Sequence, residues 1–510
     1  MNAYPFTQQD KRMFPKPQTD LKSNTPEFEV TPLAAATGFR EYDARWLFPQ
    51  DVNLMGIQAL GMGIATQMSR LGIRPVIVVG HDYRSYSQSI KYALITGLMA
   101  SGCEVLDIGL ALSPMAYFSQ FALDAPAVAM VTASHNDNGW TGVKIGMERP
   151  LTHGPDQMAQ LKEIVLTADF IEGRGAYKFI PDLREKYLAD MTKNFRLKHP
   201  LKVVAACGNG TAGLFAPGAL RAIGAEVVEL DCGLDFTFPN HNPNPEDMKM
   251  LHAVHDAVLA AKADVGLAFD GDGDRCGVVD NEGEEIFADK IGLFLARDFS
   301  AQFPGATFVV DVKSTGLYQT DDVLRANGAK IDYWKTGHSH MKRRVKQLNA
   351  LAGFEKSGHY FFNPPFGHGY DDGLVSALAV CRFLDNNPGK KMADLRRALP
   401  MTWGSPTMAP FCPDETKYGV VDKVSAHYVK LAADGGKLLG QKIREVVTVN
   451  GVRVVLEDGT WGLVRASSNK PSLLVVVESP VSEQKMRDMF AEIDARLSTF
   501  PDVGEYDQKI

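Results

Sequence analysis

The chain has 510 residues, which is too many for one hydrophobic core and predicts about three or four domains. Apolar residues make up 45% and charged residues 23%, the proportions of an ordinary soluble globular protein. The net charge of -7 argues against a broad nucleic-acid-binding surface. It leaves room for a local basic pocket that binds a phosphorylated small molecule.

The cysteines and the N-terminal segment indicate a cytoplasmic protein. Six cysteines occur without a CxxC pair or a metal-ligand spacing, as expected for small core residues in a reducing compartment. No apolar run approaches the roughly 18 residues of a transmembrane helix, so no membrane partner is expected. Residues 1–30 are polar, contain four prolines and lack the apolar region of a secretory signal. They are expected to form a flexible arm or a strap over the first domain.

Three stretches of the chain repeat one order of elements. In the first, residues 31–178, we expect helices at about 53–70 and 88–100 and strands at 76–79, after Gly102 and at 127–131. The same order returns in residues 179–284 and 285–398, where Gly224 and Gly328 take the place of Gly102. The repeat predicts three similar α/β domains with mixed, mostly parallel sheets.

Residues 399–510 break this pattern and predict a C-terminal α+β domain. A hairpin is expected over 446–455, with Asn450 and Gly451 supplying the positive φ angles of a type I′ turn. Strands at 461–464 and 473–478 and a helix at about 482–498 complete the domain.

The loop after the buried strand 127–131 contains a candidate phosphate carrier. Ser134 lies three residues after the end of this strand, and Lys144 is the nearest cation. Loops at the carboxyl ends of parallel strands are where α/β proteins hold their chemistry. The alternative is an ordinary polar turn that happens to contain a serine.

The loop after strand 265–269 predicts a metal site. Asp270, Asp272 and Asp274 alternate with glycines, and three carboxylates so close together repel one another unless a cation neutralises them. Oxygen ligands favour Mg²⁺ or Ca²⁺. An EF-hand is excluded because Arg275 and Asn281 stand where that motif needs glycine and glutamate. A solvated acidic turn is the alternative.

Three further loops carry groups suited to a sugar phosphate. The stretch from Arg465 to Pro471 combines cations, hydroxyls and an amide that can surround a phosphate, although a surface turn is the simpler interpretation in isolation. Glu355, Ser357 and His359 offer donors and acceptors for sugar hydroxyls. His338 is either a capping residue or a phosphate ligand. Taken together, the loops indicate phosphoryl transfer to a sugar through a phosphoserine. No GxSxG or P-loop motif supports a serine hydrolase or a P-loop kinase.

These motifs, in this order, resemble the α-D-phosphohexomutases and most closely the bacterial phosphomannomutase/phosphoglucomutase group. The resemblance runs from about Phe39 to Glu478 and rests on five segments, namely Phe39–Arg45, Thr132–Asn136, Asp270–Arg275, Glu355–His359 and Arg465–Asn469. It implies the heart-shaped four-domain architecture of that superfamily. The chain departs from the family pattern at Asp137 (usually proline), at Ser468 and Asn469 (usually asparagine and threonine) and at Phe354, which displaces a glycine.

The resemblance implies a phosphomannomutase that interconverts mannose 6-phosphate and mannose 1-phosphate through a hexose 1,6-bisphosphate, which also serves as activator. One Mg²⁺ per chain would be bound by phosphorylated Ser134 and the three aspartates. Proton transfer and charge stabilisation would fall to Lys144, Arg45, His338 and Arg275. The substrate ligands would be Tyr42, Lys313, Glu355, Ser357, His359, Arg465, Ser467, Ser468 and Asn469.

Two other functions remain open at this point. A phosphoglucomutase differs in its sugar only at C2, and a non-catalytic sugar-phosphate sensor would keep the fold without turnover. The partners expected in every case are hexose phosphates, with no nucleic acid and no membrane, for a monomer or a dimer.

Overall fold

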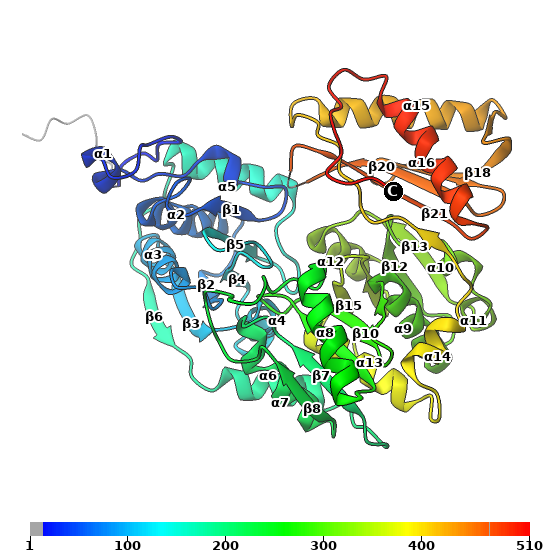
Figure 1. The fold of residues 1–510 in the computed structure, drawn as a ribbon. Helices are drawn as coiled ribbons and strands as arrows, with labels where there is room; N and C mark the ends of the chain where they lie inside the picture. Colours follow the sequence, from blue (N-terminus) through cyan, green and yellow to red (C-terminus); the bar gives the residue numbers. More distant parts are fainter. Residues whose placement is uncertain (1–13, 469) are drawn as a thin grey trace, which may run out of the picture. The chain divides into compact units, whose positions relative to one another are not determined.

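The computed structural model describes residues 14–468 and 470–510. The chain forms two compact units, one of residues up to Ala111 together with Met115–Leu183, and one of Leu112–Pro114 together with Arg184–Ile510. The first unit contains one β-sheet and the second contains three (Figure 1).

The first unit is built on a six-stranded mixed sheet of order β1-β5-β4-β2-β3-β6. Its longest helix, α2, is capped by Asn53, whose side chain accepts a hydrogen bond from the Gly56 amide. Gly61 on α2 and Gly97 on α3 let the two helix backbones approach so closely that a Cβ on either would clash. The elements are α1 (Pro26–Val30), η1 (Ala36–Gly38), β1 (Ala44–Leu47), α2 (Leu54–Arg70), β2 (Val76–His81), α3 (Ser87–Ala100), β3 (Glu104–Leu110), α4 (Ser113–Ala122), β4 (Ala127–Val131), β5 (Trp140–Gly146), α5 (Pro155–Thr167) and β6 (Ala176–Phe179).

The described part of the expected N-terminal arm is hydrogen-bonded to the first unit. The Gln18 amide donates to the Pro32 carbonyl at 2.8 Å, and the Asn53 side chain donates to the Phe28 carbonyl at 3.2 Å. Residues 1–13 lie outside the described residues.

The second unit begins with a five-stranded sheet of order β11-β10-β9-β7-β8 and a four-stranded sheet of order β13-β12-β14-β15. The first of these sheets and its helices comprise α6 (Leu183–Thr192), β7 (Lys202–Ala206), η2 (Thr211–Leu214), α7 (Ala216–Ala222), β8 (Glu226–Leu230), α8 (Met248–Ala261), β9 (Val265–Phe269), β10 (Cys276–Asp280) and β11 (Glu285–Ile286). The second comprises α9 (Ala288–Gln302), β12 (Thr307–Asp311), α10 (Leu317–Thr320), α11 (Asp322–Ala326), β13 (Lys330–Trp334), α12 (His338–Gln347), β14 (Ala352–Phe354), β15 (Tyr360–Phe362), α13 (Gly373–Asp385) and α14 (Met392–Arg397).

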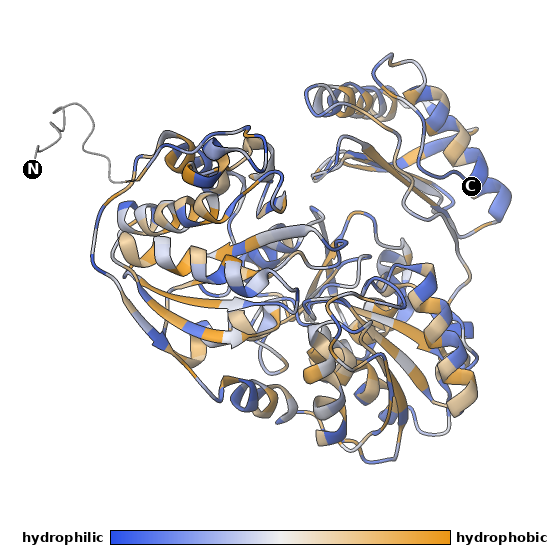
Figure 2. Ribbon diagram, turned by 60° about the vertical axis from the view of Figure 1, so that its left-hand side comes forward, coloured by the Kyte–Doolittle hydropathy of each residue, from blue (hydrophilic) through white to orange (hydrophobic). Residues whose placement is uncertain are grey.

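The predicted repeat is confirmed by the strand order. Three parallel strands recur in the same arrangement, as β4-β2-β3, β9-β7-β8 and β14-β12-β13, and in each case the third strand in sequence pairs with a following antiparallel strand. The expectation of mixed, mostly parallel sheets is therefore correct. Figure 2 shows apolar residues along these strands, which agrees with their burial. The loop between the third strand and its antiparallel partner contains Ser134 in the first sheet, Asp270–Asp274 in the second and Glu355 in the third.

The fourth sheet is antiparallel, as expected of an α+β domain, and α15 and α16 pack on one of its faces (Figure 1). Its opposite face packs Trp461 and Leu463 against Val312, beside the end of β12. The predicted type I′ turn is wrong, because β18 and β19 are separated by four residues and only Gly451, not Asn450, has positive φ. The elements are β16 (Trp403–Gly404), α15 (Lys417–Ala433), β17 (Lys437–Leu438), β18 (Gln441–Val447), β19 (Val452–Leu456), β20 (Trp461–Ala466), β21 (Leu473–Ser479) and α16 (Glu483–Leu497).

Two expectations from composition can be compared with the structure. All six cysteines are buried and form no disulfide bonds. Within residues 14–468 and 470–510, none of the helices combines the length and the apolar character needed to span a bilayer.

Candidate active site

Ser134 is the third residue of the polar loop between β4 and β5 in the first unit. Its side chain is almost completely buried, and its backbone has φ +53°, a left-handed conformation that non-glycine residues rarely adopt. The Ser134 amide donates to Thr132 Oγ1 at 2.8 Å, and the hydroxyl lies 3.3 Å from His135 Nδ1. The serine is therefore presented on a well-defined turn.

Two of the predicted basic residues flank this loop within the first unit. Arg45, on β1, donates from Nη1 to Asn136 Oδ1 at 3.0 Å and forms an ion pair with Asp43 at 2.6 Å. Lys144, on β5, lies opposite Met130 of β4 and is buried. The antiparallel return of β5 thus brings Lys144 back beside the strand that leads into the serine. Tyr42 is also buried in this unit.

The aspartate loop between β9 and β10 gathers three carboxylates in the second unit. Asp270, Asp272 and Asp274 are fully buried, and one oxygen of each lies within 4.8 Å of the others. Asp270 Oδ1 accepts the Asp274 amide at 3.1 Å, and Asp272 Oδ2 accepts the Ser113 hydroxyl at 2.6 Å. These bonds close the loop so that the carboxylates converge.

This arrangement fits a hard divalent cation. Three buried carboxylates at such separations repel one another, and Arg275, whose Nε lies 3.8 Å from Asp270 Oδ2, supplies only one compensating charge. Carboxylate oxygens are ligands that Mg²⁺ and Ca²⁺ use, together with other oxygen donors such as water and phosphate. The aspartate loop therefore has the carboxylate arrangement that could hold the divalent cation expected from the sequence.

His359 links the aspartate loop to the loop between β14 and β15, which contains Glu355, Ser357 and His359 and is called the sugar-recognition loop for its expected role. Its Nε2 lies 3.3 Å from Asp274 Oδ1, and its Nδ1 lies 3.2 Å from Glu355 Oε2. Burial and the positive charge of Arg275 oppose protonation of the imidazole, but the two carboxylates outweigh them and raise the His359 pKa to about 9. Burial likewise opposes ionisation of Glu355, but its hydrogen bond with His359 outweighs that effect and lowers the Glu355 pKa.

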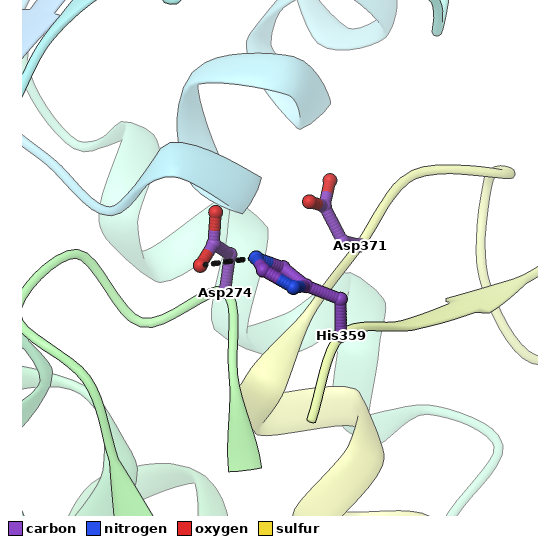
Figure 3. Close-up of side chains that lie close together, drawn as sticks. All are labelled: Asp274, His359 and Asp371. Carbon is purple, nitrogen blue, oxygen red and sulfur yellow. Dashed lines mark ion pairs between the residues drawn. The ribbon is translucent and has the colours of Figure 1, made fainter. Parts of the chain in front are cut away.

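A third carboxylate, Asp371, approaches the same histidine, so that Asp274, His359 and Asp371 form a second cluster with atoms within 4.8 Å (Figure 3). Asp371 Oδ1 pairs with Lys342 Nζ at 2.8 Å, and both side chains are fully buried. Because a lysine and a protonated histidine already supply two positive charges here, this second cluster is a poor site for a cation. It is a buried ion-pair network behind the sugar-recognition loop.

The remaining predicted residues of the third sheet gather around this loop. Glu355 Oε1 accepts the Gly337 amide at 2.5 Å, which ties the His338 segment to the sugar-recognition loop. The rings of His338 and His359 lie 6.1 Å apart between centroids. Lys313 and Ser357 line a cavity of about 350 Å³ together with Lys356. Sequence reasoning therefore identified a set of side chains that the fold does bring together.

The candidate phosphate-binding loop follows β20 in the fourth sheet. Arg465 and Ser467 are buried, and Ser468 is partly exposed. Lys417, which sequence reasoning missed, lies beneath the loop and donates from Nζ to the carbonyls of Ser467 at 2.5 Å and Lys470 at 3.1 Å. Asn469 lies outside the described residues.

The residues missed by sequence reasoning are supporting groups on other elements. They include Asp82 and Arg84 near the serine, Ser113 at the aspartate loop, Lys342 and Asp371 behind His359, and Lys417. The signal for the first two is the polar loop 81–87 between a strand and a helix, which by itself indicates no role. The others gave no local signal, because each contacts the site from a distant part of the chain.

Comparisons with known proteins identify the family of the chain. Four family models match in order, described as phosphoglucomutase/phosphomannomutase alpha/beta/alpha domains I, II and III and the C-terminal domain. They cover residues 36–172, 185–283, 287–402 and 412–496. A phosphomannomutase/phosphoglucomutase of Pseudomonas putida is 33% identical over 454 residues, which is 89% of this chain and 94% of that protein. A phosphoglucomutase of Neisseria meningitidis is 31% identical over 448 residues, 86% of this chain and 92% of that one.

A solved structure of a phosphoglucomutase/phosphomannomutase family protein from Burkholderia thailandensis is 29% identical, has a TM-score of 0.82 and covers 92% of this chain and 98% of its own. The resemblance, the fold class and the enzyme class expected from the sequence are thereby confirmed. The chain belongs to the phosphoglucomutase/phosphomannomutase family of phosphohexomutases.

Proposed function

We propose that the chain interconverts the 6- and 1-phosphates of mannose, and also those of glucose, through a phosphoserine at Ser134. One observation carries the proposal: the serine loop and the buried three-carboxylate loop occupy equivalent strand ends of an internal repeat. The similarity to proteins named for both sugars supports the dual substrate range. The substrates would be hexose monophosphates, with a hexose 1,6-bisphosphate as intermediate and activator.

The chemistry consists of two phosphoryl transfers in opposite directions. The phosphate on Ser134 passes to the free hydroxyl of the hexose monophosphate, leaving the serine hydroxyl and a bisphosphate. The other phosphate of the bisphosphate then returns to Ser134, which releases the isomeric monophosphate. The scheme requires that phosphorylated Ser134 reach the aspartate loop during the reaction.

The metal in this proposal is one Mg²⁺, which Asp270, Asp272, Asp274 and a phosphate oxygen on Ser134 would hold. When bound, the ion neutralises charge that develops on the transferring phosphoryl group. Arg275, Arg45 and Lys144 would add positive charge around that group.

Proton transfer in this proposal falls to Lys144, Arg45 and His338, the residues expected from the sequence. The two ring nitrogens of His359 lie 3.3 Å from Asp274 Oδ1 and 3.2 Å from Glu355 Oε2, so this residue would position the substrate-binding loop.

The substrate ligands are proposed from the loops of the second unit and from Tyr42. Glu355 and Ser357 would accept and donate hydrogen bonds to ring hydroxyls. The phosphate that does not react would be bound by Lys313, Arg465, Ser467, Ser468 and Asn469. We further propose a cytoplasmic enzyme that acts as a monomer or a dimer.

Substitution of Ser134 by alanine tests the proposal. The variant should lose at least about 1,000-fold in mutase rate with mannose 1-phosphate and glucose 1-phosphate, assayed with the 1,6-bisphosphate, because it cannot carry the phosphate. Intact mass should show a species one phosphate heavier in the native chain and none in the variant. A native chain without phosphate and without turnover would favour the sugar-phosphate sensor instead.

A further inference from the structure

Ser134 adopts a backbone conformation that it would not hold alone. Its φ of +53° belongs to the left-handed region, and it is not a glycine. A residue persists in such a conformation only when the surrounding structure fixes it. The loop from Thr132 to Asn136 therefore needs an anchor, and the anchor lies in the segment that follows β2.

Arg84 supplies the first half of that anchor. Its Nη2 donates to the Ser134 carbonyl at 3.0 Å and to the Asn136 carbonyl at 2.7 Å, so one guanidinium nitrogen binds the loop on both sides of His135. The Arg84 side chain is 1% exposed and forms an ion pair with Asp82 through Nη1. The planar fork of an arginine can satisfy a carboxylate and two carbonyls at once, which a lysine ammonium does less well.

Asp82 supplies the second half. Its Oδ2 accepts the Thr132 hydroxyl at 2.8 Å and the Ala133 amide at 3.3 Å, and its Oδ1 accepts the Ser87 hydroxyl at 2.5 Å. Thr132 Oγ1 in turn accepts the Ser134 amide at 2.8 Å. A chain of hydrogen bonds therefore runs from the carboxylate to the backbone of the serine itself.

The topology explains why these two residues reach the loop. β2 and β4 are neighbouring parallel strands, with His81 opposite Val131, so the segments that follow them leave the same edge of the sheet. The Asp82 amide donates to the Val131 carbonyl at 3.0 Å and continues the ladder by one step. A fully buried ion pair is a weak source of stability compared with apolar side chains of the same volume. The Asp82–Arg84 ion pair instead fixes the backbone conformation of the loop from Thr132 to Asn136.

We propose that Asp82 and Arg84, the Asp82–Arg84 clamp, are positioning residues that keep Ser134 oriented for accepting and donating the phosphoryl group. This inference rests on the proposed function of Ser134 as phosphate carrier. The clamp acts through the backbone of the loop. The candidate sugar and phosphate ligands other than Tyr42 lie on loops of the second unit, so a weakened clamp should slow phosphoryl transfer with little change in sugar affinity.

The test compares Arg84→Lys, Arg84→Met and Thr132→Val with the native chain. Arg70→Met is the matched control, because Arg70 pairs with Asp169 on the surface, where the two side chains are 46% and 67% exposed. We expect kcat to fall about 100-fold in Arg84→Met, about 10-fold in Arg84→Lys and 3- to 10-fold in Thr132→Val, with KM for mannose 1-phosphate within 3-fold. The control should stay within 2-fold in both parameters.

Two readouts separate positioning from general stability. The rate at which glucose 1,6-bisphosphate phosphorylates each variant, followed by intact mass, should fall in parallel with kcat. Hydrogen exchange of amides 133–139 should accelerate in the clamp variants and not in the control. If Arg84→Met does not fold, the same two readouts on Arg84→Lys and Thr132→Val test the proposal.

Folded clamp variants that keep native kcat and native exchange would overturn the proposal, and so would a loss expressed mainly in KM. Failure of the proposed function would look different. In that case the native chain would show neither phosphoserine nor turnover, whereas the exchange experiment would still report whether the clamp orders the loop.

Discussion

The serine loop and the aspartate loop both turn sharply after a buried strand, but they place different residue types at the left-handed position. Both follow a fully buried strand of the internal repeat and both turn sharply before an antiparallel strand. In the aspartate loop the turn is made by a glycine, Gly273, at φ +73°. In the serine loop Ser134 itself has a left-handed conformation, in addition to Gly139 at φ +95° just before β5. The strained backbone therefore belongs to the proposed phosphate carrier in the serine loop, whereas in the aspartate loop a glycine adopts the left-handed conformation and the aspartates do not.

The two loops also differ in how charge is compensated. Around Ser134 the buried charges are paired within the protein, as in the Asp82–Arg84 clamp. Around Asp270, Asp272 and Asp274 the negative charge exceeds what Arg275 and His359 supply. The clamp beside the first loop is thus neutral overall, whereas the carboxylates of the second loop carry excess negative charge that suits a cation. Three experiments sharpen this difference.

The largest effect is expected from Asp272→Asn. Removing one ligand charge should lower kcat about 100-fold or more and weaken Mg²⁺ binding, since the cation is held by carboxylates. The Ser113 hydroxyl can still donate to the amide oxygen, so the fold should persist. Magnesium titration by calorimetry and by mutase rate measures both consequences. An Asp272→Asn chain with native magnesium affinity would contradict the assignment of this loop, and Asp169→Asn on the surface is the control.

A smaller effect is expected from the charge on His359. Its folded pKa of about 9 exceeds the ordinary value of 6.5, so its contribution to stability is fully present below pH 6.5 and is lost as the pH rises through about 9. The shift corresponds to about 3 kcal/mol at most. In metal-free buffer, the difference in unfolding free energy between the native chain and His359→Gln should therefore shrink from pH 6 to pH 9.5.

The comparison with His359→Gln removes a second pH effect. Burial raises the pKa of Glu285 and of Asp372 to about 7, so each destabilises the fold as the pH rises from about 4 towards 7. Both groups are present in the two chains and cancel in the difference. A difference that stays constant from pH 6 to pH 9.5 would show that His359 is not protonated in the folded protein.

The smallest effect is expected from changing the residue at the left-handed position of each loop, Gly273 in the aspartate loop and Ser134 in the serine loop. Gly273→Ala should cost about 1–2 kcal/mol, because alanine is strained at φ +73° and its Cβ would lie 2.8 Å from a Leu112 side-chain carbon. Ser134→Gly should change stability by less than about 1 kcal/mol, since relief of strain is offset by the entropy of an unfolded glycine. Chemical denaturation of the native chain and of both variants measures the two changes in the free energy of unfolding. A large gain in Ser134→Gly would mean that the clamp leaves more strain in the loop than its hydrogen bonds suggest.

Much of the site could be predicted because its chemistry is local in the sequence. Ser134, the three aspartates and the Glu355–His359 segment each lie within a few residues of a strand end, and the repeat gave them equivalent positions. The turn at Asn450 was predicted wrongly because the strands end earlier than their residue types suggest, which leaves four residues between them. Strand ends depend on tertiary pairing as well as on local propensity.

The sequence by itself determined the family, the repeat, the order of the chemical loops and the identity of the charged groups in them, because these are properties of short contiguous segments. Only the tertiary structure decided which distant residues support those groups. Arg84 lies 50 residues before Ser134, and Lys342 on α12 reaches Asp371, which precedes α13. The protonation of His359 likewise depends on Asp274 and on burial, neither of which is visible along the chain. Such contacts arise from packing between elements, and packing is fixed only when the sheets are assembled.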